Sequence, residues 1–142
     1  MATTLEGDEA LAWTFMRPRT AKLGVVRSSG AALVAPVWVA RDGDQIVFNT
    51  GEGTAKAKAI ARDPRVTLCF DDEHPPFSFV VIDGTAELSE DLAEVTRWAT
   101  EIGGRYMGAD RAVEYGSRNG VPGELLVRVT PTRARGVLDI AD

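Results

Sequence analysis

A succession of short apolar segments separated by turn signals constrains this chain more than any other feature of its sequence. Residues 21–44 predict two strands on either side of the turn Ser28-Ser29-Gly30. A second turn is predicted at residues 41–44, because Asp-Gly is a strong hairpin signal, and a third strand follows at residues 45–49. Strands joined by such short turns pair antiparallel, so the pattern predicts a meandering antiparallel sheet.

The rest of the chain adds three strands and two or three helices. The further strands are predicted at residues 65–70, 77–88 and 124–139, the second with a bulge or bend at Asp83-Gly84. The helices are predicted at residues 7–16, at residues 54–62 and after the N-cap Ser89. Antiparallel sheets protect their edges by closing. The predicted fold class is therefore mainly β with flanking helices (α+β): a six-stranded antiparallel barrel in a single domain over residues 1–142.

Three glycines limit the last predicted helix. Gly103, Gly104 and Gly108 are expected to break the apolar stripe that begins after Ser89, because glycine disfavours a helix interior. Residues 116–123 contain further turn-forming residues and are expected to form a loop before the last strand.

Composition excludes several classes of function. Asp and Glu outnumber Lys and Arg by 21 to 16, so the net charge of −5 disfavours a general attraction to nucleic acid or anionic membranes. No apolar stretch reaches the ~20 residues that span a bilayer. Cys69 is the only cysteine, which excludes an intrachain disulfide and fits a cytoplasmic location. His74 is the only histidine, and without a nucleophile-elbow motif no hydrolytic triad is predicted.

The acidic stretch at residues 71–74 is the one candidate for a metal site. Three carboxylates and the imidazole of His74 stand together there. Pro75-Pro76 follows directly and predicts an extended turn, in which acidic side chains are ordinarily solvated. No metal site is therefore predicted.

Residues 49–58 form the most informative segment, because a strand end, a glycine-containing loop and a helix start follow one another. Unpaired N–H groups and the positive end of a helix attract anions. Lys56 and Lys58 are two of only three lysines in the chain, and lysine is unfavourable in a first helical turn unless an anion binds there. Residues two apart point to opposite sides of a helix, so only one lysine can face a given phosphate. Thr54 and Lys56 are the preferred phosphate pair, Lys58 is the weaker candidate, and solvated lysines are the alternative.

A second unusual segment is Val34-Ala35-Pro36-Val37-Trp38, where proline stands within an otherwise good strand. Proline belongs at the edge of a sheet or at a bulge. One interpretation is an edge strand protected from aggregation. The other is a break whose neighbouring backbone groups bind the rim of a flat heterocycle.

Several motifs in a fixed order resemble the pyridoxamine 5'-phosphate oxidase-like superfamily. They are Ala-Lys-Leu-Gly-Val-Val, Val-Ala-Pro-Val-Trp-Val, Ile-Val-Phe-Asn-Thr, Gly-Thr-Ala-Lys-Ala-Lys, Arg-Asp-Pro-Arg-Val-Thr-Leu and Val-Ile-Asp-Gly-Thr-Ala-Glu-Leu, within residues 21–88. The branch that the chain resembles most closely is the deazaflavin-dependent oxidoreductases. The resemblance implies a split β-barrel homodimer of the flavin-binding type, with two cofactor sites at the subunit interface.

The same resemblance assigns roles to individual residues. It implies that the strand beneath the cofactor ring presents Val34, Pro36 and Val37. It implies that the contacts to the phosphate and sugar chain come from Asn49, Thr50, Thr54 and Lys56. Lys58 and Arg62 are then placed to reach an acidic tail of the cofactor. Phe77 and Phe79 are placed to line the side of the pocket that faces the partner subunit.

The function implied is that of an oxidoreductase dependent on coenzyme F420, acting on a small organic substrate with an electron-poor double bond. No catalytic side chain is assigned, and the proton donor is left open between a bound water and Tyr106. The arginine- and alanine-rich composition is typical of actinobacteria, in which F420 is common. Two alternatives stay open: an FMN-dependent oxidase or reductase of the same fold, and a non-catalytic protein that binds flavin, F420 or a tetrapyrrole. A second phosphate site, needed to oxidise pyridoxamine phosphate, has only Arg133 and Arg135 as candidates.

Overall fold

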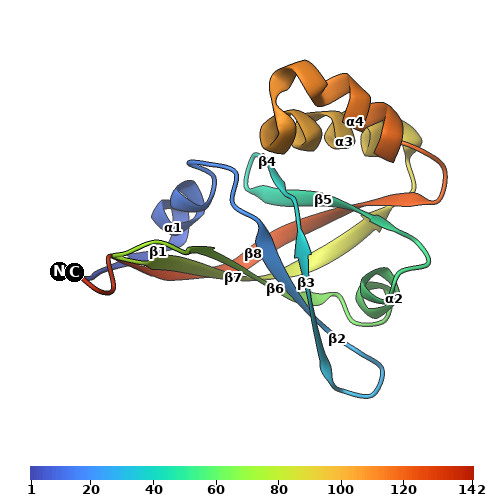
Figure 1. The fold of residues 1–142 in the computed structure, drawn as a ribbon. Coiled ribbons are helices and arrows are strands. Elements are labelled where there is room, and N and C mark those ends of the chain that lie inside the picture. Colours follow the sequence, from blue (N-terminus) through green and yellow to red (C-terminus); the bar gives the residue numbers. More distant parts are fainter.

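The computed structural model describes residues 1–142 and is built around one antiparallel sheet (Figure 1). Its strands are β1 (Thr3–Glu6), β2 (Ala21–Val26), β3 (Ala32–Val37), β4 (Ala40–Asp42), β5 (Gln45–Gly51), β6 (Arg65–Asp72), β7 (Ser78–Ser89) and β8 (Glu124–Leu138). They lie in the order β3-β2-β6-β7-β8-β5-β4, and β1 pairs with β8.

This arrangement confirms the predicted fold class and corrects its strand count. All six predicted strands are present, but β1 and β4 raise the number to eight, and the sheet does not close on itself. Both additional strands are too short to show a clear alternation of apolar and polar residues. β4 has only three residues and lies within the segment that the sequence assigns to a strand end and a turn.

The helices cover the ends of the sheet. They are α1 (Gly7–Thr14), α2 (Ala55–Arg62), α3 (Leu92–Met107) and α4 (Ala112–Asn119), with a 3-10 turn η1 (Ala109–Arg111) before α4. α3 and α4 connect β7 to β8 and lie together beside β4 and β5, whereas α2 lies below them in the view of Figure 1. None of these helices combines the length and apolarity required to cross a membrane.

The predicted end of α3 was wrong. The helix continues through Gly103 and Gly104 and ends only at Gly108, whose φ of 106° suits glycine. A Cβ at Gly103 would lie well inside contact distance of the Tyr115 side chain on α4. Glycine at Gly103 therefore lets α4 approach α3 closely. The predicted loop at residues 116–123 is helical up to Asn119 for the same reason: α4 packs on α3.

Alternation along the strands separates a buried face from an outer face. In β2, Ala21, Leu23 and Val25 are buried, while the intervening residues are partly exposed. The main core has 19 buried residues, and the largest side chains include Phe48 and Phe70. A second, smaller core lies under α3 and comprises Ala40, Val47, Val95, Trp98, Ile102 and Leu126. Burying a large apolar side chain contributes about 1.5–3 kcal/mol, so these clusters fix the helices to the sheet.

β3 is an edge strand, as Pro36 requires, and it runs without a break. The Arg27 N–H donates to the Ala31 carbonyl, which makes this pair a hydrogen-bonded one. Hydrogen-bonded and non-hydrogen-bonded pairs alternate in an antiparallel ladder. The register Lys22↔Pro36 therefore places Pro36 in a non-hydrogen-bonded pair, and the proline removes no ladder bond. The bulge expected near Asp83-Gly84 is also present, as a register shift between these residues.

Candidate functional site

A pocket of about 330 Å³ brings several of the predicted site residues together. We call it the α2 pocket. It is lined by Thr20, Pro36, Val37, Trp38, Asn49, Lys56, Ile102 and Asn119. Hollows of about 580–680 Å³ lie elsewhere on the surface. None of these three contains a lysine or any residue predicted for the cofactor site, although Arg133 and Arg135 line the hollow of about 580 Å³. The smaller pocket is therefore the candidate cofactor site.

The loop before α2 is held by two threonine hydroxyls. Thr54 caps the helix: its Oγ accepts from the Ala57 N–H at 3.2 Å and donates to the Gly51 carbonyl at 2.8 Å. The Oγ of the buried Thr50 lies 3.1 Å from the Thr54 Oγ. These hydroxyls are committed to the loop, so the two threonines shape the site and do not point a free hydroxyl into it.

The N-terminal N–H groups of α2 and one lysine supply the positive charge of the site. The first N–H groups of a helix lack helical partners, and Thr54 satisfies only that of Ala57. Lys56 is half-buried and lines the α2 pocket, whereas Lys58, two positions further, is exposed and does not line it. Arg62 is turned away, because its guanidinium donates to the Val26 carbonyl.

Glu124 places an acidic group beside this loop from the neighbouring strand β8. It pairs with Gly51 across β8 and β5, and its carboxylate would lie 3.9 Å from a Cβ at that glycine. Burial raises the pKa of the Glu124 carboxyl, while the charge of Lys56 lowers it to a lesser extent. Sequence reasoning missed this residue, because only the β5–β8 register brings it beside the loop.

The apolar floor of the pocket comes from the end of β3. Pro36 and Val37 line it, but Val34, which is 65% exposed, does not. Asn49 is positioned by α3, because its side-chain amide donates to the Val95 carbonyl at 3.4 Å. Within this one chain, Val34 lies on open surface outside the pocket.

The helical insertion supplies the opposite wall. Ile102 and Asn119 come from α3 and α4, and Thr20 from the segment before β2. Sequence reasoning did not find these three residues. They lie far apart in the chain, and neither an apolar side chain nor a lone amide carries a signal for a ligand site.

Tyr106 is not placed to donate a proton to the pocket. Its hydroxyl donates to the Arg19 carbonyl at 2.6 Å and accepts from the Val39 N–H at 3.1 Å. Burial raises the pKa of this phenol, and the contacts with the Val39 N–H and Arg105 lower it less. The hydroxyl is therefore occupied and neutral, and it acts as a clamp between two backbone segments.

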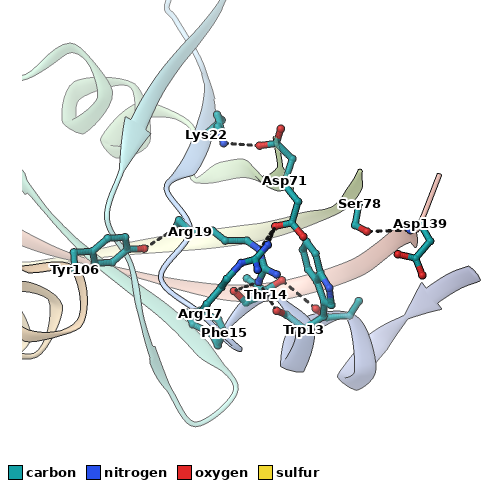
Figure 2. Close-up of polar contacts among 12 residues, drawn as sticks. Trp13, Thr14, Phe15, Arg17, Arg19, Lys22, Asp71, Ser78, Tyr106 and Asp139 are labelled. Atoms are coloured by element: carbon teal, nitrogen blue, oxygen red, sulfur yellow. Dashed lines mark hydrogen bonds and ion pairs between the residues drawn. The ribbon is translucent and has the colours of Figure 1, made fainter. Parts of the chain in front are cut away.

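Figure 2 shows that the acidic stretch at residues 71–74 begins with paired carboxylates and not with solvated ones. Asp72 binds the guanidinium of Arg19 at 2.8 Å and that of Arg17, and Lys22 binds Asp71 at 2.5 Å. Arg19 also donates to the Trp13 carbonyl at 2.7 Å. The expectation of solvated acids was therefore wrong for these two aspartates, which β6 aligns with cations around β2.

Arg135 is likewise occupied: it binds Asp83 at 3.0 Å. This ion pair weakens the case for a second phosphate site near the C-terminus.

The chain belongs to the pyridoxamine 5'-phosphate oxidase family, whose model matches residues 8–138. A conserved hypothetical protein from Mycobacterium tuberculosis is similar in structure, with a TM-score of 0.79 and 22% identity over 93% of this chain and 84% of that one. A structure described as an F420 reductase matches with a TM-score of 0.62 and 22% identity, covering 83% and 90% of the two chains.

The heme storage protein HutZ from Vibrio cholerae has the same fold, with a TM-score of 0.70 and 14% identity over 92% of this chain and 94% of its own. None of the curated proteins matches this chain. At these identities the similarities establish the split-barrel fold, and proteins of this fold include both a reductase and a storage protein.

Proposed function

We propose that this protein is an F420-dependent oxidoreductase that transfers a hydride to an electron-poor double bond of a small organic substrate. The observation that carries the proposal is the composition of the α2 pocket. Lys56, in the first turn of α2, lines this pocket together with the apolar Pro36–Val37 segment. A cofactor with a flat ring and a phosphate requires these two kinds of surface in one site.

The charges around α2 favour a cofactor that continues beyond its phosphate. Lys58 is exposed one half-turn from Lys56 and has no partner among the ion pairs of the structure. FMN ends at its phosphate, whereas F420 continues into a lactyl-glutamate tail with further carboxylates. Lys58 is therefore the residue that we assign to the tail, and Lys56 the residue for the phosphate.

The protein's contribution to the reaction is binding and orientation. When bound in its reduced form, F420 would supply the hydride (two electrons and one hydrogen) that the double bond accepts, and it would be oxidised in return. The substrate then needs one proton, which we assign to water, because the Tyr106 hydroxyl is occupied by two backbone groups. No side chain lining the pocket is a strong acid or a nucleophile, so alignment of the two reactants is the main catalytic effect.

We infer that the functional unit is a homodimer in which a second copy covers β3 and the neighbouring outer face of the sheet. Val34 is 65% and Phe77 42% exposed in the isolated chain. Covering such side chains would remove apolar surface from water and would enclose the open side of the α2 pocket. Val34 would then join the cofactor site through the dimer.

Fluorescence titration with oxidised F420 and, separately, with FMN tests the proposal. Lys56→Ala removes a charged contact worth about 1.5–3 kcal/mol, so F420 should bind about tenfold or more weakly. Lys58→Ala, on the same helix, removes only the exposed contact that we assign to the tail, and it should weaken F420 binding by about threefold or less. Equal effects of the two variants would refute the phosphate assignment, and no binding of either cofactor would refute the function.

The alternatives differ in measurable ways. An FMN-dependent oxidase or reductase would bind FMN more tightly than F420, and Lys58→Ala would then have no effect on affinity. A non-catalytic carrier would bind reduced F420 without reoxidising it when an acceptor is added. A histidine-ligated heme is disfavoured, because His74, the only histidine, is exposed at the end of β6 and does not line the α2 pocket.

A further inference from the structure

Trp38 is a large aromatic side chain that is exposed at the wall of the α2 pocket. It follows β3 directly, is 37% exposed and lines the pocket. The other tryptophans are used differently: Trp98 belongs to the core under α3, and Trp13 is covered by the Arg19 guanidinium at 3.6 Å. Trp38 is thus the only tryptophan with surface available to a ligand in this pocket.

Two tyrosines of the helical insertion fix the orientation of the indole. Tyr106 stacks on it with ring centroids 5.0 Å apart and an interplanar angle of 4°. Tyr115 contacts it in a tilted arrangement at 6.1 Å and 58°. Tyr106 thus covers one face of the indole, and 37% of Trp38 remains exposed beside these two rings.

The Tyr106 hydroxyl also fixes the backbone on both sides of the pocket. It accepts from the N–H of Val39, the residue after Trp38, and donates to the carbonyl of Arg19, the residue before Thr20. Trp38 and Thr20 both line the pocket. Arg19 is in turn held by Asp72 and by the Trp13 carbonyl, and Figure 2 shows it beside the end of α1. Tyr106 therefore holds the aromatic wall at a fixed distance from the neighbouring strand.

The chemistry of this wall points to one class of ligand. The face of an indole is electron-rich, and aromatic systems stack best in offset arrangements that oppose charge of unlike sign. A double bond that accepts hydride is electron-poor, and conjugation makes it planar. The remaining polar groups of the pocket are the neutral Thr20, Asn49 and Asn119 and the cationic Lys56, so no acidic side chain lines it to repel such an acceptor.

We propose that Trp38 is the specificity-determining residue for planar, conjugated acceptors, and that Tyr106 is its positioning residue. The role of the acceptor in turnover depends on the proposed function. Binding of a planar acceptor to Trp38 does not depend on it, and it is measurable in the protein without cofactor.

Calorimetric titration with menadione, a planar quinone, tests the binding step. Trp38→Leu should weaken binding about fivefold, within the roughly two- to twelvefold range of an aromatic stacking contact, and Trp38→Phe should have a smaller effect. Leu92→Ala is the control, since Leu92 is comparably exposed at 44% but lies on α3 outside the pocket. Unchanged menadione affinity in Trp38→Leu, or an equal loss in the control, overturns the proposal.

Steady-state kinetics separate selection of flat molecules from general damage. Trp38→Leu should raise the KM for menadione about fivefold and leave that for 2-cyclohexen-1-one, a small non-aromatic enone, within twofold. Tyr106→Phe keeps the stacked ring but loses both backbone contacts, so it should raise the KM for menadione with kcat unchanged. Equal losses for the two acceptors overturn the proposal.

Cofactor titrations distinguish failure of this inference from failure of the proposed function. We expect Trp38→Leu to bind F420 with unchanged affinity. If F420 affinity falls as much as menadione affinity, Trp38 supports the cofactor ring and the inference is overturned. If the unmodified protein binds menadione through Trp38 but binds no F420, the proposed function is refuted and the specificity assignment stands.

Discussion

Replacing Arg19 by methionine is expected to destabilise the protein more than any single surface ion pair would. The Arg19 guanidinium is nearly buried and donates to Asp72 at 2.8 Å and to the Trp13 carbonyl at 2.7 Å, and it covers the Trp13 ring (Figure 2). A hydrogen bond to a charged group is worth about 1.5–3 kcal/mol and a cation–π contact about 0.5–2 kcal/mol. Arg17 still neutralises Asp72 in the variant, so a loss of about 2–4 kcal/mol in the free energy of unfolding is expected.

The effect should depend on pH with a defined sign. Burial raises the pKa of the Asp72 carboxyl, but the hydrogen bonds from Arg19 and Arg17 outweigh it and hold the pKa below its ordinary value of 3.8. A lowered carboxyl pKa contributes stability that is fully present above the unfolded value and is lost as the pH falls through the folded value. The difference between Arg19→Met and the unmodified protein should therefore shrink below pH 3.8.

Urea unfolding monitored by circular dichroism at about pH 7 and pH 3 measures both effects. Arg17→Met is the matched control: it removes a cation from the same carboxylate, but its side chain is 59% exposed, so a loss of about 1 kcal/mol or less is expected. Similar losses in the two variants, or a difference that grows on acidification, would refute the reasoning.

Three further predictions concern packing, assembly and charge. Gly103→Ala should lower the free energy of unfolding by about 1–3 kcal/mol, because its Cβ overlaps a tyrosine of α4, while Gly53→Ala, with no atom within 4 Å, should be nearly neutral in urea unfolding. Val34→Asp should convert the proposed dimer to a monomer in sedimentation equilibrium, and an unchanged mass would count against β3 as the interface. Glu124→Gln removes a negative charge beside the α2 loop, so F420 should bind about threefold more tightly in the fluorescence titration. Weaker binding in this variant would contradict the electrostatic argument.

Local sequence patterns were sufficient to predict most of the sheet. The alternation in residues 65–70 and 77–88 and the turn at Asp42-Gly43 gave strands that the structure confirms. Pro36 correctly indicated an edge strand, since proline is disfavoured in a strand that pairs on both sides. The prediction failed where long-range packing overrides local preference: Gly103 and Gly104 lie inside α3, because α4 needs their lack of a Cβ.

The sequence predicted the side of the candidate site formed by Lys56 and part of the apolar floor, since Pro36 and Val37 also line the α2 pocket. Lys56 carries a local signal, because a lysine near a helix start is electrostatically unfavourable without an anion, and it does line the α2 pocket. The stacking of Trp38 on Tyr106 has no local signal in the sequence. Nothing in the local sequence links Trp38 to Tyr106, and their parallel stacking arises only because the α3–α4 insertion packs beside β4 and β5.

The two sides of the α2 pocket thus have different origins, and this separates cofactor binding from substrate selection. β5 and α2 are adjacent in the chain, and they supply Asn49 and Lys56 to the cationic side. The opposite wall requires the insertion between β7 and β8, which contributes Ile102 and Asn119 and holds Trp38 through Tyr106. Substitutions on the insertion's pocket face should therefore alter which acceptors are reduced while F420 affinity is retained, whereas substitutions around Lys56 should do the reverse.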